Sequence, residues 1–310
     1  MNYEFDLSIY VATYNHEKYI KKALDSIFMQ KTKYSFEVLV GEDCSTDNTR
    51  LVLKEYEKKN YNNLRIYYRQ KNMSNMDISN AMDLIMRCRG KYLIALEGDD
   101  YWIDENKIEK QISFLESHPD YLAVSHKCIV VDKNGKENGE RYPECKDKHY
   151  KYRHFLFDLL PGQLTTVMYR NFRSFDLGID RSLTLNCKEL GPGDRATSFT
   201  LLLNGKIYCM KDAMSAYRHV TNEGSSYSAT YKYDYRKSIK YLYQFVLYAR
   251  KLKNIRAEII AETLFYASVC HAYRGKELTK FEYQKCVNEI HNPTIAKLLY
   301  VIRGVRKRII

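Results

Sequence analysis

The sequence of 310 residues contains no CxxC pair and no cluster of cysteine and histidine at the spacing of a zinc site. Its eight cysteines are scattered, which indicates reduced thiols and a cytoplasmic protein. No stretch approaches the length of apolar chain that crosses a bilayer, and residues 1–6 are polar. We therefore expect neither a membrane-spanning helix nor a signal peptide. Repeats and low-complexity linkers are also absent, which leaves an ordinary folded chain.

Glycine is missing from the loop that follows the first predicted strand, residues 11–18. Dinucleotide-dependent oxidoreductases need the pattern GxGxxG there, because glycine lets the backbone approach the pyrophosphate. Nucleotidyltransferases that make activated sugars likewise need a glycine-rich phosphate loop near the N-terminus. The sequence therefore argues against both classes of enzyme.

The net charge of +12 is concentrated near the C-terminus. Residues 230–310 contain 17 Lys and Arg but only 6 Asp and Glu, so the preceding part of the chain is nearly neutral. The sequence also becomes rich in tyrosine, with apolar residues at helical spacing, from about residue 232. We expect two domains: residues 1–229, and a basic helical domain of residues 230–310.

Strand-like and helix-like patterns alternate through the first hundred residues. Strands are predicted at 7–12, 36–40, 64–68 and 92–96, with amphipathic helices between them. This alternation is typical of parallel strands joined by right-handed crossovers, whose carboxyl ends meet at one edge of the sheet. Thr13, Asp43 and Asp99 are therefore predicted to be neighbours. Later strands are expected at 162–169 and 214–219, and helices at 107–116, 195–203, 241–252, 257–272 and 281–291.

Three carboxylates, Glu97, Asp99 and Asp100, follow the fourth predicted strand within four residues. Like charges this close repel one another unless a cation or a proton offsets them. Mg²⁺ and Mn²⁺ prefer oxygen ligands, so the cluster favours a metal site over a solvated acidic turn. The only tryptophan, Trp102, is nearby and would either stack on a sugar or pack in the wall of the site.

Four motifs occur in order: SIYVATYN at 8–15, EDCSTDNT at 42–49, EGDD at 97–100, and Gly193-Asp194 before a predicted helix. Together they resemble the GT-A fold glycosyltransferases of family 2 over about residues 5–220. The resemblance implies an α/β fold of GT-A type, Rossmann-like, with a mostly parallel central sheet flanked by helices. The basic segment lies outside the resemblance and would form a C-terminal all-helical extension.

The resemblance implies a metal-dependent, inverting transfer of a sugar from a nucleotide-sugar, with UDP as the expected nucleotide. The acceptor would be a hydroxyl of a glycan or lipid-linked molecule, in the synthesis of a cell-surface polysaccharide such as a capsule. Mn²⁺ or Mg²⁺ would stabilise the charge on the departing diphosphate. A single carboxylate would accept the proton of the acceptor hydroxyl.

The resemblance also assigns a nucleotide-sugar site, made of Thr13, Tyr14, Asn15, Asp43, Asn80, Glu97 and Gly98. In this assignment Asp43 accepts a hydrogen bond from a pyrimidine ring N–H, and Glu97 faces the ribose. Ser79 stands where the family commonly has a basic residue. Lys71 or a later basic residue is therefore expected to contact the diphosphate.

Metal ligands and a base follow from the same resemblance. Asp99 would bind the metal, with Asp100 assisting. His219 would be a third ligand of the metal or the diphosphate, and a purely structural histidine is the alternative.

Asp194 would be the general base, although a carboxylate near a helix N-terminus is also an ordinary cap. Asp180 and Glu189 are the alternative bases.

Apolar residues from 295 onward follow helical spacing, with Lys and Arg between them. Residues 295–310 would either lie on an anionic membrane surface, which we favour, or pack on the protein. We thus expect a cytoplasmic protein at the inner face of the cell membrane. The tyrosine-rich helices would suit a homo-oligomer. The functional alternative is a non-catalytic basic protein that binds nucleic acid or a membrane, but it gives the carboxylates no role, so we expect no nucleic acid partner.

Overall fold

The computed structural model describes residues 3–74, 78–172, 177–187, 190, 193–220 and 233–307. The chain forms two compact units. The first comprises Met1–His149, Pro161–Ile179 and Gly205–Tyr231, and the second comprises Tyr150–Leu160, Asp180–Asn204 and Lys232–Ile310. The last change of unit falls close to the boundary expected at residue 229. Two segments that the sequence analysis assigns to the first domain nevertheless belong to the second unit.

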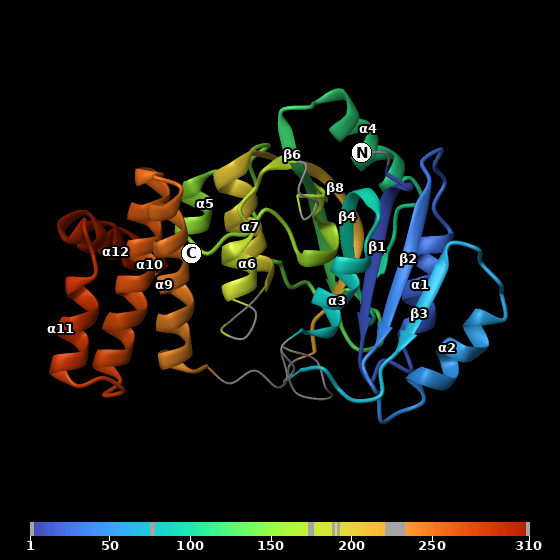
Figure 1. The fold of residues 1–310 in the computed structure, drawn as a ribbon, viewed down its shortest axis with the longest axis horizontal. Coiled ribbons are helices and arrows are strands. Elements are labelled where there is room, and N and C mark those ends of the chain that lie inside the picture. Colours follow the sequence, from blue (N-terminus) through green and yellow to red (C-terminus); the bar gives the residue numbers. More distant parts are fainter. Residues whose placement is uncertain are drawn as a thin grey trace. The chain divides into compact units, whose positions relative to one another are not determined.

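The first unit contains an eight-stranded sheet in the order β3-β2-β1-β4-β7-β6-β8-β5 (Figure 1). Its strands are β1 (Phe5–Thr13), β2 (Phe36–Glu42), β3 (Leu64–Tyr68), β4 (Gly90–Glu97), β5 (Tyr101–Trp102), β6 (Tyr121–Val131), β7 (Met168–Arg170) and β8 (Lys206–Arg218). β3, β2, β1 and β4 pair in parallel. β7 is antiparallel to β4 and β6, β8 is parallel to β6, and β5 is antiparallel to β8.

Helices and one 3₁₀ turn accompany the sheet: α1 (Ile20–Phe28), α2 (Thr49–Glu57), α3 (Asn80–Arg87), α4 (Lys107–Ser117) and η1 (Leu164–Thr166). α3 packs against β1 and β2, α1 against α2 and β5, and α4 against β6. The central parallel strands are buried along most of their length. Parallel strands buried on both faces read as continuous apolar runs, which is why the sequence predicts them.

Two later expectations differ from the structure. The strand expected at 162–169 is a 3₁₀ turn followed by the short strand β7, because the Gln163 side chain accepts a hydrogen bond from Thr165 N and turns the chain. The strand expected at 214–219 is the end of the longer β8, whose middle is exposed and polar. Trp102 is only 1% exposed, so it packs in the core and does not stack on a ligand.

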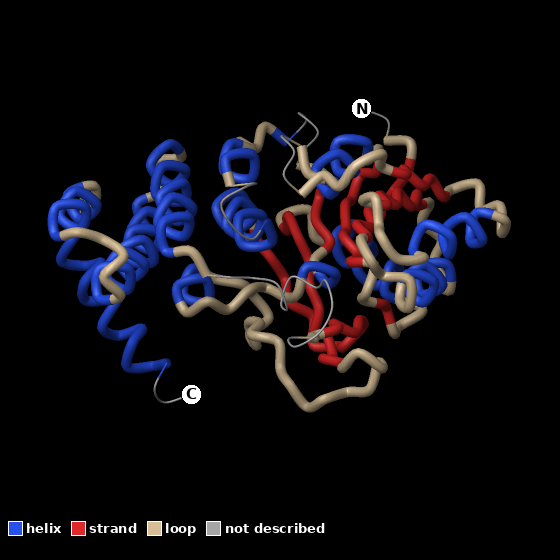
Figure 2. The backbone as a smooth tube through the Cα atoms, turned by 90° about the horizontal axis from the view of Figure 1, so that it is seen from below, coloured by secondary structure: helices blue, strands red, loops and turns tan. Residues whose placement is uncertain are grey.

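The regular elements described in the second unit are helices (Figure 2). They are α5 (Tyr152–Leu156), α6 (Ser182–Asn186), α7 (Gly193–Asn204), α9 (Tyr235–Lys251), α10 (Ile255–Arg274), α11 (Lys280–Asn288) and α12 (Pro293–Lys307). α10 is buried along most of its length and contacts α5, α9, α11 and α12. α6 and α7 contact α9, which explains why their segments belong to this unit. Among the described residues, no helix has both the length and the apolar content to cross a bilayer.

Candidate active site

The ends of three parallel strands meet at one edge of the sheet. Thr13 at the end of β1 pairs with Glu42 of β2, and its neighbour Ala12 pairs with Glu97 of β4. The register continues past the strands, because Asp43 N donates to Thr13 O (3.0 Å) and Gly98 N donates to Ala12 O (2.9 Å). The prediction that these strands bring their acidic loops together is confirmed.

Gly98 lets the acidic loop pack directly on the loop after β1. A Cβ atom at this position would lie 2.6 Å from Thr13 Oγ1 and 2.7 Å from His16 Nδ1. Real Cβ atoms do not make contacts this short, so any larger residue at this position would force the Thr13 and His16 side chains to move. The close approach holds Asp99, the next residue, beside the end of β1.

His16 is a member of the site that the sequence analysis missed. Its Nδ1 is 3.2 Å from Thr13 Oγ1, and its Nε2 is 3.8 Å from Asp99 Oδ2. Burial lowers the pKa of His16, and the attraction of Asp99 opposes this shift without cancelling it. The imidazole is therefore neutral at neutral pH. The signal in the sequence that could have identified it is its position three residues after Thr13, in the loop already assigned to the site.

Asn15 joins the loops after β1 and β2. Its backbone adopts a left-handed conformation with φ of 57°, which Asn tolerates better than most residues. Its Oδ1 accepts from Thr46 N (2.8 Å), and its own N donates to Ser45 Oγ (3.0 Å). Asn15 thus fixes the loop, and its contact with a nucleotide stays a prediction. Tyr14 beside it is half-buried.

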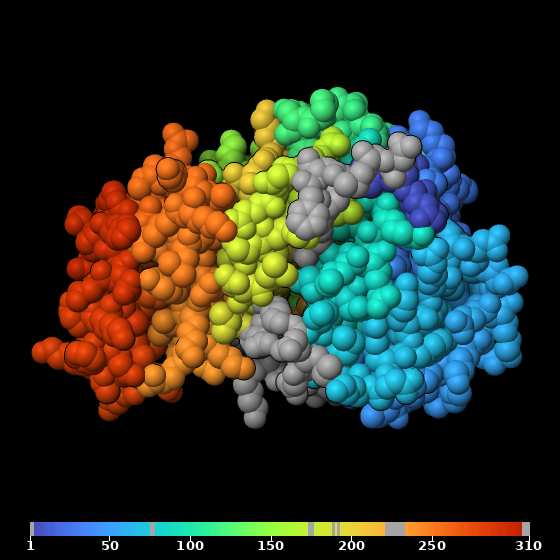
Figure 3. Space-filling view, in the orientation of Figure 1, coloured from blue at the N-terminus to red at the C-terminus, as the bar shows by residue number. Residues whose placement is uncertain are grey.

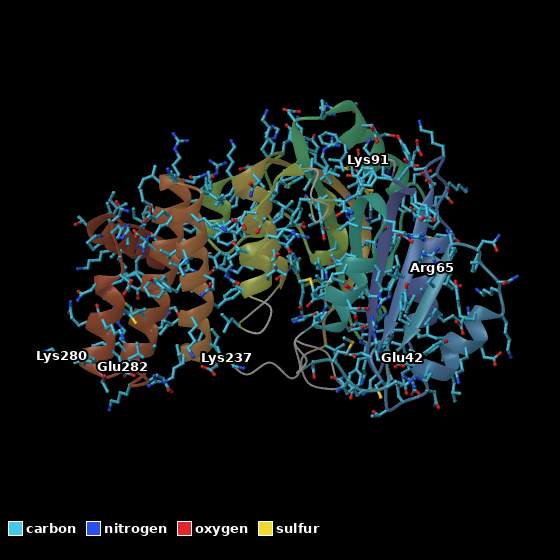
Figure 4. All side chains as sticks on the ribbon, in the orientation of Figure 1. Glu42, Arg65, Lys91, Lys237, Lys280 and Glu282 are labelled. Atoms are coloured by element: carbon cyan, nitrogen blue, oxygen red, sulfur yellow. The ribbon has the colours of Figure 1, made fainter. Side chains whose placement is uncertain are left out.

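Glu42, labelled in Figure 4, has a structural role. Its side chain is fully buried and accepts from Ser45 N (2.6 Å) and Arg50 Nε (2.6 Å). These bonds tie the loop after β2 to α2. The first acid of the EDCSTDNT motif therefore supports the loop, which leaves the next acid for a ligand.

Asp43 is 9% exposed, and its Oδ1 accepts from Met73 N (2.8 Å). Burial raises the pKa of its carboxyl, while the Met73 bond and the nearby Arg69 oppose the rise. The bond that the resemblance assigns to this carboxyl, from a nucleobase N–H, stays a prediction.

The side-chain amide of Asn80 makes its hydrogen bonds within the protein. Its Nδ2 donates to Gly41 O (2.8 Å) and its Oδ1 accepts from Arg69 Nε (3.0 Å). Arg69 also donates to Asp83 Oδ2 (2.5 Å), so its guanidinium is fixed close to Asp43. Asn80 therefore positions Arg69, and its predicted contact with the nucleotide-sugar is untested. Arg69 is a cation of this edge that the sequence analysis missed.

Asp100 anchors the acidic loop. It is 2% exposed, and its two oxygens accept from Arg218 N (2.7 Å) and Gln163 Nε2 (3.1 Å). Burial raises its pKa well above the ordinary value, and the charge of Asp99 adds to the rise. Both oxygens are used inside the protein, so the geometry favours an anchoring role. The assisting role at a metal stays a prediction.

Arg218 is a second cation that the sequence analysis missed, and it is buried. It is 5% exposed, and its Nε and Nη1 donate to Asp99 O (2.9 Å) and Asp132 O (2.6 Å). Its guanidinium carbon lies 4.2 Å from the centre of the Tyr19 ring. The positive charge offsets part of the repulsion among the carboxylates of the acidic loop.

His219 follows Arg218 and pairs with an acid. Its Nδ1 is 2.5 Å from Glu140 Oε2, and its backbone N donates to Val131 O (3.0 Å). A metal-binding histidine commonly donates its other ring N–H to a carboxylate, which leaves Nε2 for the metal. The same pair also suits a structural histidine, so both interpretations from the sequence stay open.

The residues present fit a cation that is shared with a ligand. Asp99, Asp100 and His219 do not form a compact trio, since among the described residues only one group of three has its ligand atoms within 4.8 Å of one another, and it lies in the second unit. Mg²⁺ is commonly held by one or two carboxylates together with substrate phosphates. The Asp99 carboxylate remains 17% exposed, so it suits such a site.

Asp194, the expected base, lies in the first turn of α7 in the second unit. Its Oδ1 accepts from Arg195 N (2.7 Å), and burial raises the pKa of its carboxyl. Asp180, an alternative base, pairs with Lys251 and accepts from Ser182 N, and these bonds lower its pKa. A general base works better when its pKa is raised, so the pKa shifts favour Asp194 over Asp180. Glu189 lies outside the described residues.

The family model described as "Glycosyl transferase family 2" matches residues 8–179, more than half of the chain. The chain belongs to this family. A relative from Mycobacterium tuberculosis, the uncharacterized protein Rv1520, is 33% identical over 175 residues, which are 55% of this chain and 48% of that one. The putative teichuronic acid biosynthesis glycosyltransferase TuaG of Bacillus subtilis is 26% identical over 222 residues, which are 71% of this chain and 81% of that one. The family 2 chain spans about half the length of the mycobacterial relatives it matches.

Solved structures of low identity show the fold. S. aureus TarS 1–349 has a TM-score of 0.63 at 19% identity and covers 96% of this chain and 88% of its own. The same protein in complex with UDP-GlcNAc has a TM-score of 0.62 at 21% identity and covers 91% of this chain and 79% of its own. The fold is therefore GT-A-like, with a mostly parallel sheet flanked by helices and a helical C-terminal region, as the resemblance implies. The structural similarity extends beyond the residues that the family model matches.

Proposed function

We propose that the protein is a metal-dependent, inverting glycosyltransferase. The observation that carries the proposal is the meeting of Thr13, Asp43 and Asp99 at one edge of a parallel sheet in a family 2 chain. The donor would be a sugar linked to a nucleotide diphosphate, and the structure of TarS with UDP-GlcNAc supports uridine. The acceptor would be a glycan or lipid-linked hydroxyl in cell-surface polysaccharide synthesis, which the name of TuaG supports.

The nucleotide would lie against the end of β1. Thr13 and Tyr14 would line the nucleobase pocket, and Asp43 Oδ2 would accept the ring N–H. Glu97 would face the ribose. Arg69, which Asn80 holds beside Asp43, supplies positive charge at the same edge and would attract the negatively charged nucleotide.

Asp99 would hold Mn²⁺ or Mg²⁺ together with the donor diphosphate. Bound there, the cation would offset the negative charge that the departing nucleotide diphosphate acquires. The protein fixes Asp99 through Gly98, whose lack of a side chain lets the acidic loop approach β1. Arg218 holds the Asp99 carbonyl and His16 lies at its carboxylate, so the acid is oriented before any ligand binds.

Asp194 would take the proton from the acceptor hydroxyl as it attacks the anomeric carbon. Burial raises its pKa above the ordinary value, which makes the carboxylate a stronger base than an exposed one. Attack from the face opposite to the nucleotide inverts the anomeric centre and requires one carboxylate. A retaining reaction through a covalent intermediate would need a second placed carboxylate.

Thermal unfolding with uridine, thymidine and guanosine diphosphates and their sugars, each with and without Mn²⁺, tests the proposal. A ligand at 100 times its dissociation constant adds about 2.7 kcal/mol, which moves the midpoint of a chain of this length by about 4 °C. We expect UDP to stabilise the protein only with Mn²⁺, and Asp99→Ala to abolish this Mn²⁺ dependence. Asp194→Asn should keep nucleotide binding and lose transfer. An Asp194→Asn enzyme with near wild-type turnover would refute the assignment of Asp194 as the base. Equal stabilisation by UDP without Mn²⁺ would refute the role of the metal in nucleotide binding.

The proposed setting is the inner face of the cell membrane, where a cytoplasmic enzyme meets a lipid-linked acceptor. The alternative, a non-catalytic basic binding protein, predicts binding that weakens steeply with salt and does not respond to Mn²⁺. Membership of family 2 and the clustered carboxylates support the enzyme instead. The same thermal measurement, repeated at two salt concentrations, separates the two.

A further inference from the structure

α12 exposes its apolar side. Five apolar residues of this helix are 43–60% exposed: Ile295, Leu298, Val301, Ile302 and Val305. Their spacing of three and four residues aligns them along one face of the helix. We call this set the α12 stripe. It extends over about 15 Å of helix axis, at 1.5 Å per residue. The surface of this C-terminal segment appears in red in Figure 3.

The opposite side of α12 holds the helix in the second unit. Ala296 is fully buried, and the Arg303 side chain is 11% exposed and pairs with Asp158. Tyr300 OH accepts from Arg274 Nη1 (3.0 Å) of α10. The packing side of α12 is thus the one with small and polar residues. α12 therefore packs on the second unit, as the alternative from the sequence has it, but the five residues of the α12 stripe stay exposed.

The charge of the segment restricts what can cover the stripe. Residues 293–310 contain five Lys and Arg and no Asp or Glu. Lys297 is exposed next to Leu298, so a positive charge borders the stripe. A second copy of the chain would bring cations of like sign together across a symmetric contact. The preferred occupant is therefore both apolar and negatively charged.

We infer that the α12 stripe docks the protein on an anionic lipid surface. The helix would lie in the plane of the interface, with the stripe at the boundary of the acyl chains and Lys297 among the headgroups. The inference goes beyond the proposed transfer reaction, because it concerns a surface that takes no part in catalysis. It gives the peripheral location a physical basis in named residues.

A stripe of five side chains supports only weak binding by itself. Stable attachment to a bilayer generally needs two signals, such as an apolar element and a basic patch. Binding should therefore require anionic lipid, be reversible, and weaken as salt screens the cations. These three properties distinguish docking through α12 from insertion of a spanning helix.

Co-sedimentation of the full chain with vesicles tests the inference. One set of vesicles is phosphatidylcholine alone, and the other contains equal parts of phosphatidylcholine and phosphatidylglycerol. We expect binding to the second set only, at least tenfold weaker binding for the double variant Leu298→Asp/Val301→Asp, and about fivefold weaker binding for Lys297→Gln. Phe281→Asp is the matched control, because Phe281 is 79% exposed on α11, outside the stripe.

The outcomes separate the possible occupants. Unchanged binding of the double variant would overturn the inference and assign the attraction to other basic residues. Absence of binding to both sets would also overturn it, and sedimentation velocity would then show whether the stripe joins two copies. The substituted side chains are exposed, so all variants should keep the wild-type unfolding midpoint. Because no nucleotide or sugar is used, the result does not depend on the proposed transferase activity.

Discussion

His16 Nε2 lies 3.8 Å from Asp99 Oδ2, and the two side chains are 13% and 17% exposed. This contact joins the loop after β1 to the loop after β4. Because burial lowers the pKa of His16, the imidazole meets the carboxylate as a neutral group and does not replace a cation there. The pair therefore orients Asp99 and leaves its charge available.

His16→Ala should weaken Mn²⁺-dependent binding of UDP by about tenfold, because partners that orient a metal ligand typically contribute that much. Titration calorimetry with UDP, with and without Mn²⁺, measures the change. His118→Ala, at the exposed end of α4, is the control and should bind like the wild type. Equal affinity for His16→Ala and the wild type would show that Asp99 needs no support from the imidazole.

Gly98→Ala should destabilise the first unit by about 1–3 kcal/mol, because its Cβ would overlap Thr13 and His16. The same variant should lose UDP binding, since the acidic loop must move away from β1. Gly304→Ala in α12 is the matched control: nothing lies within 4 Å of its Cβ position, and helix propensity predicts a gain of about 0.5–1 kcal/mol. Urea unfolding followed by fluorescence measures both. A tolerated Gly98→Ala would mean that the loop is not fixed by this approach.

The strand edge could be predicted because it depends on local patterns. β1, β2 and β4 are apolar runs that each end in polar residues, and parallel pairing brings such ends together without further information. The neighbourhood of Thr13, Asp43 and Asp99 follows from that rule alone. Family membership was likewise carried by short motifs, each read from a few consecutive residues.

The supporting residues could not be predicted, because their roles depend on distant partners. Arg218 contacts Asp99 across 119 positions of the chain, and nothing in the residues around Arg218 specifies that partner. The resemblance assigns Asn80 to the nucleotide-sugar site, yet its side-chain amide is hydrogen-bonded to Gly41 and Arg69. Burial and hydrogen bonding decide such roles, and both are tertiary properties.

The carboxylates of Glu258 and Glu262 form the one compact acidic group with a histidine among the described residues, and a single arginine pairs with both of them. Arg250 donates to Glu258 (2.7 Å) and to Glu262 (2.8 Å), and Glu262 is fully buried and also accepts from His291 N (2.7 Å). Glu262→Ala should therefore cost about 3–5 kcal/mol of unfolding free energy, because it leaves Arg250 short of a buried partner.

Urea unfolding of Glu262→Ala, with Glu277→Ala on the exposed surface as control, measures this loss. EDTA should leave the midpoint of the wild-type protein unchanged in the absence of nucleotide, since Arg250 supplies the positive charge. A fall in the midpoint with EDTA, restored by Zn²⁺ or Mn²⁺, would instead make this group a structural metal site.

Glu144 should make stability depend on pH. Burial raises the pKa of its carboxyl from 4.5 to about 7, although Lys127 and Lys146 oppose the shift. Its Oε2 is buried and has no hydrogen-bond partner among the described residues. The folded state then holds a proton that the unfolded state releases, so the stabilising effect of that proton is complete below about pH 4.5. It is lost as the pH rises to about 7, and stays lost above that value.

Glu144→Gln should remove this part of the pH dependence, because an amide keeps the shape of the protonated acid and carries no charge. Relative to the wild type, the variant should gain stability progressively between about pH 4.5 and 7 and keep a constant advantage at higher pH. Comparing urea midpoints at intervals across this range isolates Glu144, since all other titrating groups are shared. Glu137 is exposed in the same loop, so the curve of urea midpoint against pH for Glu137→Gln should run parallel to that of the wild type. A Glu144→Gln curve that also runs parallel would mean that the carboxylate is solvated in the folded protein.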